Sequence, residues 1–378
     1  MSNDALPESD RLDGAPHPRE AAHLYGHTAQ EAEFLTAATS GRLPHGWLLT
    51  GPKGIGKATF AWRAARFLLA TPPPGDDGMF GAPPPPDTLE IPPDNPIARR
   101  MAALSEPGLF LLRRPWDHDN KRLKTQLTVD EVRGLKGFFQ LSAGGGHRRV
   151  VIVDSADEMN TSAANALLKE LEEPPDGAVL FLISHRPSGL LPTIRSRCRT
   201  LRFNALDDAE LAKALTQAGA EPPSDPREGI ALATLAQGSV GAAISLARQD
   251  GPALYGDIAK LLGTLPNMDR QLALRLAEAT AGKTNEARFE LTLSLLDIAL
   301  SRAARIGATG QIPPEITIGE AATLSRLAPS PHHAREWAHL AQSLTARARR
   351  GKAVNLDPAA LVFDIFLDLD RMAVRLAA

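Results

Sequence analysis

The sequence predicts an α/β fold, in which a parallel β-sheet carries helices on both faces and is followed by segments that are entirely helical. Short apolar runs alternate with amphipathic segments up to residue 203, and beyond it only helical periodicity continues. Apolar strands separated by helices are typical of parallel sheets that are covered on both faces. The five expected strands are 46–50, 109–113, 149–154, 179–184 and 200–203.

The chain has 378 residues, which is enough for two or three domains. We expect a core over residues 1–205, a helical lid over 206–252 and a helical collar over 253–378. Within the core, the polar residues 1–20 indicate a loose leader. Residues 71–96 are dense in proline, which is excluded from helix interiors and central strands, so this stretch is expected to be a surface insertion.

Composition excludes several classes of protein. A formal net charge of −2 argues against a strongly basic nucleic-acid binder, although a local basic face remains compatible with it. The single cysteine, Cys198, rules out an internal disulfide and a cysteine-cluster zinc site. Residues 1–20 have no apolar run typical of a signal peptide, and no stretch reaches the roughly 18 apolar residues of a membrane span. A cytoplasmic location is therefore expected.

The strongest motif is a phosphate-binding loop (P-loop) over residues 51–57. It follows a predicted strand and opens a predicted helix, as such a loop must. Its glycines let backbone N–H groups converge on phosphate oxygens, and its lysine reaches the β and γ phosphates. A glycine-rich turn with a chance lysine is the alternative, which this context disfavours. The expected nucleotide-binding residues of the loop are Gly51, Gly54, Gly56 and Lys57.

Two positions that should support hydrolysis carry the wrong side chains. Ala58 stands where a serine or threonine would hold Mg²⁺, and Thr59 is rotated by about 100° from that direction. Asp154 ends an apolar strand, as the magnesium-holding aspartate of a Walker B strand does. Ser155 then replaces the glutamate that would polarise water, and Glu158 is too far along the turn to take its place. The sequence therefore permits ATP or ADP binding without hydrolysis at this loop, and it does not decide whether a nucleotide binds.

The stretch 160–198 resembles the AAA+ clamp-loader family. The resemblance rests on the motifs NALLK at 165–169, LEEPP at 171–175 and the triplet Ser196-Arg197-Cys198. In that family the arginine of the triplet projects onto the ATP of a neighbouring subunit. The resemblance therefore implies that Arg197 is a catalytic arginine finger acting in trans, which is worth about 10³–10⁵ in rate. An ordinary arginine beside a buried cysteine is the alternative.

Two further family positions bear on the same reaction. Ser184 falls at the sensor 1 position, where it either bonds a γ-phosphate or caps the strand, and Gly241 replaces the sensor 2 arginine. Together with Ala58 and Ser155, Gly241 indicates that the chain is not an ATPase on its own.

This pattern is similar to the delta-prime (stator) family of the bacterial DNA polymerase III clamp loader, over most of residues 20–245. The resemblance implies a subunit of a replication hetero-oligomer. Its expected partners are the gamma/tau ATPase subunits and the delta subunit, with the sliding clamp and primer–template DNA reached through the complex. Many relatives carry a four-cysteine zinc module, which this chain lacks, so neither zinc nor any other metal is expected.

The sequence also allows other interpretations. One is a self-sufficient AAA+ ATPase, either a clamp-loader motor or a recombination-associated ATPase. Another is a structural scaffold in which Arg197 is idle. Two polar clusters also allow a binding role, although a solvated loop and a solvated helix end are the simpler interpretations. They are Asp117, His118 and Asp119 for a metal, and Arg347, Arg349, Arg350 and Lys352 for DNA or a partner.

Overall fold

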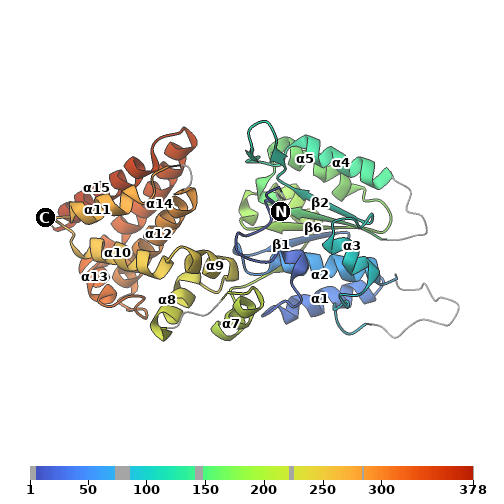
Figure 1. Ribbon diagram of the computed structural model, residues 1–378, viewed down its shortest axis with the longest axis horizontal. Coiled ribbons are helices and arrows are strands. Elements are labelled where there is room, and N and C mark those ends of the chain that lie inside the picture. Colours follow the sequence, from blue (N-terminus) through green and yellow to red (C-terminus); the bar gives the residue numbers. More distant parts are fainter. Residues whose placement is uncertain (1–5, 73–85, 141–147, 221–224, 283–284, 378) are drawn as a thin grey trace, which may run out of the picture. The chain divides into compact units, whose positions relative to one another are not determined.

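The computed structural model describes residues 6–72, 86–140, 148–220, 225–282 and 285–377. It divides into two compact units: unit 1 comprises Met1–Pro222 with Gly238–Gly241, and unit 2 comprises Pro223–Gln237 with Ala242–Ala378. Unit 1 holds the β-sheet, and the described part of unit 2 is helical (Figure 1). The three-part division expected from the sequence stays a prediction, and residues 73–85 of the proline-rich insertion lie outside the described residues.

A five-stranded sheet forms the centre of unit 1, in the order β2-β5-β6-β1-β7 with every neighbouring pair parallel. This confirms the predicted α/β fold, and each predicted strand is found to within one residue at either end. The strands are β1 (Gly46–Thr50), β2 (Leu109–Arg113), β5 (Arg149–Asp154), β6 (Ala178–Ser184) and β7 (Arg199–Arg202). An additional antiparallel pair, β3 (Trp116–Asp117) and β4 (Arg122–Leu123), was not predicted.

Helices cover both faces of the sheet (Figure 1). One layer contains α1 (Thr28–Thr39), α2 (Lys57–Ala70) and α3 (Pro96–Ala102), and the other contains α4 (Val129–Gln140) and α5 (Thr161–Glu172). The remaining elements of unit 1 are short. They are η1 (Pro18–Glu20), η2 (Ala156–Glu158), η3 (Pro187–Gly189), α6 (Pro192–Arg197) and α7 (Asp208–Gln217).

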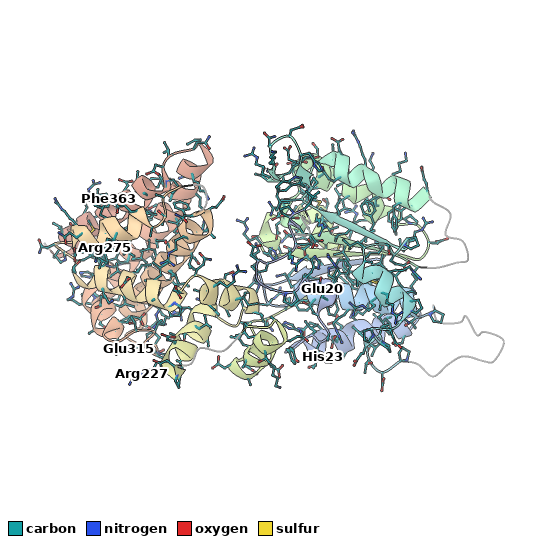
Figure 2. The ribbon with its side chains drawn as sticks, in the orientation of Figure 1. Glu20, His23, Arg227, Arg275, Glu315 and Phe363 are labelled. Carbon is teal, nitrogen blue, oxygen red and sulfur yellow. The ribbon has the colours of Figure 1, made fainter. Side chains whose placement is uncertain are left out.

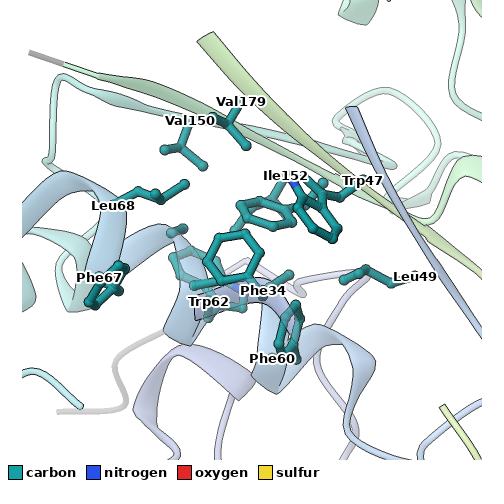
Figure 3. Close-up of a cluster of buried hydrophobic side chains, with 14 of the residues drawn as sticks. Phe34, Trp47, Leu49, Phe60, Trp62, Phe67, Leu68, Val150, Ile152 and Val179 are labelled. Atoms are coloured by element: carbon teal, nitrogen blue, oxygen red, sulfur yellow. The ribbon is translucent and has the colours of Figure 1, made fainter. Parts of the chain in front are cut away.

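The alternation of side chains along each strand divides the core into two parts. In β1, Trp47 and Leu49 join the cluster under α1 and α2, whereas Leu48 joins the cluster under α4 and α5. The first cluster is rich in aromatic rings: Phe34 packs at 5.1 Å from Trp47 and 5.7 Å from Phe60 between ring centroids, mostly edge to face (Figure 3). Because both faces are buried, β1, β5 and β6 read as nearly continuous apolar runs, and the sequence could therefore reveal them.

The expectation of a loose leader is wrong for the described residues 6–20. Glu8 lies 2.8 Å from the guanidinium of Arg19 and 3.0 Å from that of Arg113, and the side chain of Asp10 has no exposed surface. Figure 2 labels Glu20 and His23 near the end of this segment, on the side of the sheet that α1 and α2 cover. Charged partners elsewhere in the chain hold this polar segment, and composition alone does not reveal them.

Unit 2 is built from helices that pack in pairs, with α12 along α14, and α15 against α11 and α14. Its helices are α8 (Pro226–Ala236), most of α9 (Val240–Arg248), α10 (Gly251–Gly263), α11 (Arg270–Glu278), α12 (Glu286–Thr309), α13 (Glu320–Leu327), α14 (Pro331–Ala353) and α15 (Pro358–Ala377). Asp357 caps the start of α15, because its carboxylate accepts the N–H of Ala360 at 3.0 Å. None of the helices in the described ranges is long and apolar enough to cross a bilayer.

One buried polar network ties unit 2 together. The carboxylate of Glu320, 1% exposed, accepts the hydroxyl of Tyr255 at 2.6 Å and the guanidinium of Arg302 at 2.7 Å. Burial, together with the hydrogen bond to Glu320, raises the pKa of Tyr255 and keeps its phenol neutral. Full satisfaction of this buried charge lets it persist in an apolar bundle.

We expect the substitution Phe34→Ala to lower the free energy of unfolding by about 3–5 kcal/mol, because it empties the centre of the aromatic cluster. Equilibrium urea denaturation followed by tryptophan fluorescence measures the change. Leu104→Ala, at a side chain that is 42% exposed, is the control and should change stability by less than about 0.5 kcal/mol. Equal effects of the two substitutions would contradict the proposed core.

Candidate nucleotide site and arginine finger

The P-loop joins β1 to α2, and its lysine is turned back onto the loop itself. Gly51, Gly54 and Gly56 all have positive φ (144°, 79° and 108°), a conformation that side chains disfavour. Lys57 is only 3% exposed, and its Nζ donates to the carbonyl oxygens of Gly51 at 2.7 Å and Pro52 at 2.5 Å. Burial lowers the pKa of Lys57 to about 8. The ammonium group thus already has partners within its own loop.

The segment that carries Gly241 packs directly on the P-loop. The N–H of Gly241 donates to the carbonyl of Gly54 at 3.0 Å, and the hydroxyl of Ser239 donates to the carbonyl of Lys53 at 2.8 Å. A Cβ at Gly241 would lie 3.0 Å from the Cα of Gly54. An arginine at the position of Gly241 would therefore require the loop or the segment to move.

The end of β5 carries a carboxylate but no base after it. Burial, together with the negative charges of Asp10 and Glu158, raises the pKa of Asp154 to about 7. Ser155 is buried, at 4% exposure, and offers only a hydroxyl. Glu158 is held by the guanidinium of Arg114 at 2.7 Å. Neither residue provides a carboxylate that could polarise water beside Asp154.

Ser184, at the end of β6, uses its only hydroxyl proton in a hydrogen bond within the protein. It donates to the carboxylate of Asp157 at 2.7 Å, and the backbone N–H of His185 donates to the same carboxylate. Asp157 thereby ties η2 to the end of the neighbouring strand. Sequence reasoning missed Asp157, because its partners lie 27 and 28 residues further along the chain.

The residues present do not fit a site that hydrolyses Mg²⁺-bound ATP. Ala58 packs its methyl group against the aromatic core and has no hydroxyl for a metal. The lysine, the sensor 1 serine and the tip of the loop are engaged in contacts within unit 1.

Arg197 lies near the amino ends of the parallel strands, whereas the P-loop lies at their carboxyl ends. These two ends are called here the amino edge and the carboxyl edge of the sheet. Its carbonyl oxygen is 3.2 Å from the position that a Cβ would take at Gly46, the first residue of β1, whereas the P-loop follows Thr50, the last. Five residues of parallel strand place these two ends about 13 Å apart. The Arg197 side chain, about a third exposed, instead pairs with Glu172 at 2.7 Å. It therefore faces away from the chain's own loop.

Cys198 anchors the end of α6 beneath β1. Its Sγ lies 3.1 Å from the position of a Cβ at Gly46, and its side chain belongs to the core under α4 and α5. Burial raises the pKa of the Cys198 thiol to about 12. The residue therefore positions the neighbouring Arg197 and has no reactive thiolate of its own.

The two polar clusters noted in the sequence are engaged with their own surroundings. The Asp117 carboxylate accepts the backbone N–H groups of Asp119 and Asn120 at 3.1 and 3.0 Å, which closes a turn. Across the described ranges, no group of three or more His, Cys, Asp or Glu residues is placed to hold a metal ion. In the basic run, three side chains pair with carboxylates of α12 and α15: Arg347 with Asp364 and Asp368, Arg349 with Glu290, and Lys352 with Glu286.

Comparison with known proteins gives a consistent set of relatives. Residues 26–207 match the family described as DNA polymerase III, delta subunit. The chain is 41% identical over 154 residues to the delta′ subunit of DNA polymerase III from Pseudomonas aeruginosa, a match that covers 41% of each protein. It is 30% identical over 218 residues to the delta′ subunit from Escherichia coli K12, covering 58% of this chain and 59% of that relative.

The matched segments span less than two thirds of these relatives' own lengths. Among solved structures, a DNA polymerase III gamma subunit-related protein from Thermotoga maritima covers 90% of this chain and 99% of its own, at 19% identity and a TM-score of 0.41.

We expect the single cysteine of the native protein to react with a thiol reagent at pH 8 about 10³-fold more slowly than in the urea-unfolded chain, because the raised pKa of Cys198 removes its thiolate. Stopped-flow measurement with 5,5′-dithiobis(2-nitrobenzoic acid) gives both rates. The unfolded chain should release one equivalent of chromophore and so acts as the internal control. A native rate within about tenfold of the unfolded rate would refute the buried placement of this thiol.

Proposed function

We propose that the chain is the delta-prime (stator) subunit of a clamp loader, because its residues 26–207 match the family described as DNA polymerase III, delta subunit. In this role the chain does not hydrolyse ATP itself. It inserts Arg197 into the site of a neighbouring gamma/tau subunit, and it assembles with the delta subunit in the cytoplasm. The complex then loads a sliding clamp onto primer–template DNA during replication.

The position of Arg197 is the observation that carries this proposal. The side chain lies at the amino edge of the sheet, whereas the P-loop lies at the carboxyl edge. An arginine in that place is unable to serve its own loop, yet its exposed face is open to a second molecule. A planar guanidinium suits the charge that develops on a transferring phosphoryl group.

The partner that holds Arg197 in the free subunit is easily exchanged. Glu172 and Arg197 are 46% and 35% exposed, and such surface ion pairs are worth about 0–1 kcal/mol. A triphosphate on a neighbouring subunit carries more negative charge than one carboxylate and accepts bidentate hydrogen bonds. We infer that Glu172 orients Arg197 in the free subunit through an ion pair weak enough to be exchanged for the triphosphate.

The state of the chain's own P-loop supports a role without hydrolysis in cis. Ala58, Ser155 and Gly241 each lack a group that hydrolysis requires, and Gly241 packs on the loop itself. The helices of residues 253–378 would then serve as the collar that holds the ring of subunits together. No observation on the described residues favours the self-sufficient ATPase over this arrangement.

The purified chain should hydrolyse ATP no faster than buffer containing Mg²⁺, because its loop lacks the metal-holding hydroxyl and the base. Release of phosphate over hours, with and without DNA, measures this. Turnover on the order of 1 s⁻¹, ordinary for an ATPase, would make the chain a motor in its own right.

In the reconstituted clamp loader with clamp and DNA, Arg197→Ala should lower ATP turnover at the adjoining site by about 10³–10⁵-fold, since the finger stabilises the transition state. Steady-state ATPase is the readout, and gel filtration should show unchanged assembly. An unchanged ATPase rate would indicate a scaffold in which Arg197 is idle.

Two matched variants separate the finger from its surroundings. Arg195→Ala removes another exposed arginine from the same helix, and it should leave turnover unchanged. Glu172→Ala breaks the ion pair but keeps the finger, so turnover should change by less than about fivefold. If Glu172→Ala reproduced the loss seen for Arg197→Ala, the ion pair and not the finger would be the cause.

A further inference from the structure

We propose that the described residues 6–20, here called the N-terminal arm, form an intramolecular plug that closes the P-loop and keeps nucleotide out. The inference goes beyond the proposed function and does not depend on it. It concerns what fills the approach to a loop that has kept the glycines and the lysine of a phosphate-binding motif. Three sets of contacts support it: one beside the end of β5, one within the arm and against α2, and one at the tip of the loop.

The first contact fixes the arm beside the end of β5. Arg113, the last residue of β2, pairs in register with Asp154 of β5. The guanidinium of Arg113 donates to the carboxylate of Asp10 and lies 3.0 Å from that of Glu8. The arm therefore places two carboxylates next to the strand end where a magnesium-bound phosphate would have to lie.

The second set of contacts locks the arm onto itself and onto α2. The Nδ1 of His17 accepts the N–H of Arg19 at 3.1 Å, which leaves Nε2 as the ring nitrogen that carries a proton. That Nε2 lies 3.1 Å from the second carboxylate oxygen of Asp10, and both side chains are fully buried. The ring of His17 packs edge-on against Trp62 at 5.6 Å between centroids. Separating such a buried pair would leave an uncompensated buried charge, so this contact holds the arm in place.

The third contact is at the tip of the P-loop. A Cβ at Gly241 would lie 3.7 Å from the Cδ2 of Leu12 and 3.0 Å from the Cα of Gly54. Leu12 therefore covers the place where Gly241 and Gly54 meet. Further along the chain, the Cδ1 of Leu24 lies 2.9 Å from the position of a Cβ at Gly56. The chain thus follows the loop from the side of Asp154 to the start of α2.

The charges of the arm oppose a triphosphate. Burial by itself would raise the pKa of Asp10, but His17 and Arg113 hold it below its usual value, so the carboxylate is ionised at neutral pH. A phosphate entering beside Asp154 would meet this negative charge. It would also have to take Arg113 from both Asp10 and Glu8. Binding therefore requires the arm to leave, and its cost reduces the apparent affinity by the fraction of chains in which the arm is released.

The test uses the full chain without clamp-loader partners, so failure of the proposed function does not affect it. Binding of N-methylanthraniloyl-ATP is followed by fluorescence anisotropy, with and without Mg²⁺. Asp10→Asn removes the charge that binds Arg113, and Leu12→Ala opens the tip while it keeps that anchor. Asp13→Ala, at an exposed carboxylate of the same arm, is the matched control. Limited trypsin cleavage after Arg19, 12% exposed in the docked arm, reports release.

We expect wild type and Asp13→Ala to show no saturable binding up to about 1 mM nucleotide. Asp10→Asn and Leu12→Ala should each speed cleavage after Arg19 and gain affinity by at least about tenfold. Adding Lys57→Ala to either variant should abolish the gain, which would assign it to the P-loop.

Two results would overturn the proposal. One is binding to wild type as tight as to the two variants. The other is cleavage that shows arm release with no gain in affinity. If Asp10→Asn does not fold, Leu12→Ala alone decides between these outcomes, because it leaves the buried pair of Asp10 and His17 in place.

Discussion

The burial of a parallel sheet on both faces is the constraint on which the rest of the structure depends. Side chains of β1, β5 and β6 alternate between two cores, one under α1 and α2 and one under α4 and α5. Functional groups of the sheet can therefore emerge only at its two edges. The P-loop leaves β1 at the carboxyl edge, and Arg197 is fixed near the amino edge by Cys198 beneath Gly46. The length of one strand keeps the two apart.

At the carboxyl edge, groups that bind phosphate in a P-loop enzyme are engaged in contacts within unit 1. Lys57 bonds to carbonyls of its own loop, Ser184 bonds to Asp157, and the backbone of Gly241 rests on Gly54. Each contact satisfies a buried polar group that would otherwise be costly. These contacts stabilise unit 1 at the place where a P-loop enzyme would bind phosphate.

At the amino edge, by contrast, the functional side chain is exposed to solvent. Arg197 is exposed and pairs with Glu172, itself half exposed, and with the carbonyl of Thr193. It ends the short helix α6, which a buried, unreactive thiol follows. A side chain that acts on another molecule must be exposed and must be carried by a rigidly packed element.

The sequence by itself determined the strands, the loop and the missing groups. Buried parallel strands are unbroken apolar runs, and the identities of Ala58, Ser155 and Gly241 need no coordinates to be recognised as chemical losses. Only the tertiary structure decided how the polar residues are used. Glu8 and Asp10 find partners 11 and 103 residues away, so a segment that looks loose by composition is fixed. Charges pair across the fold, and no local pattern records the distance between them in space.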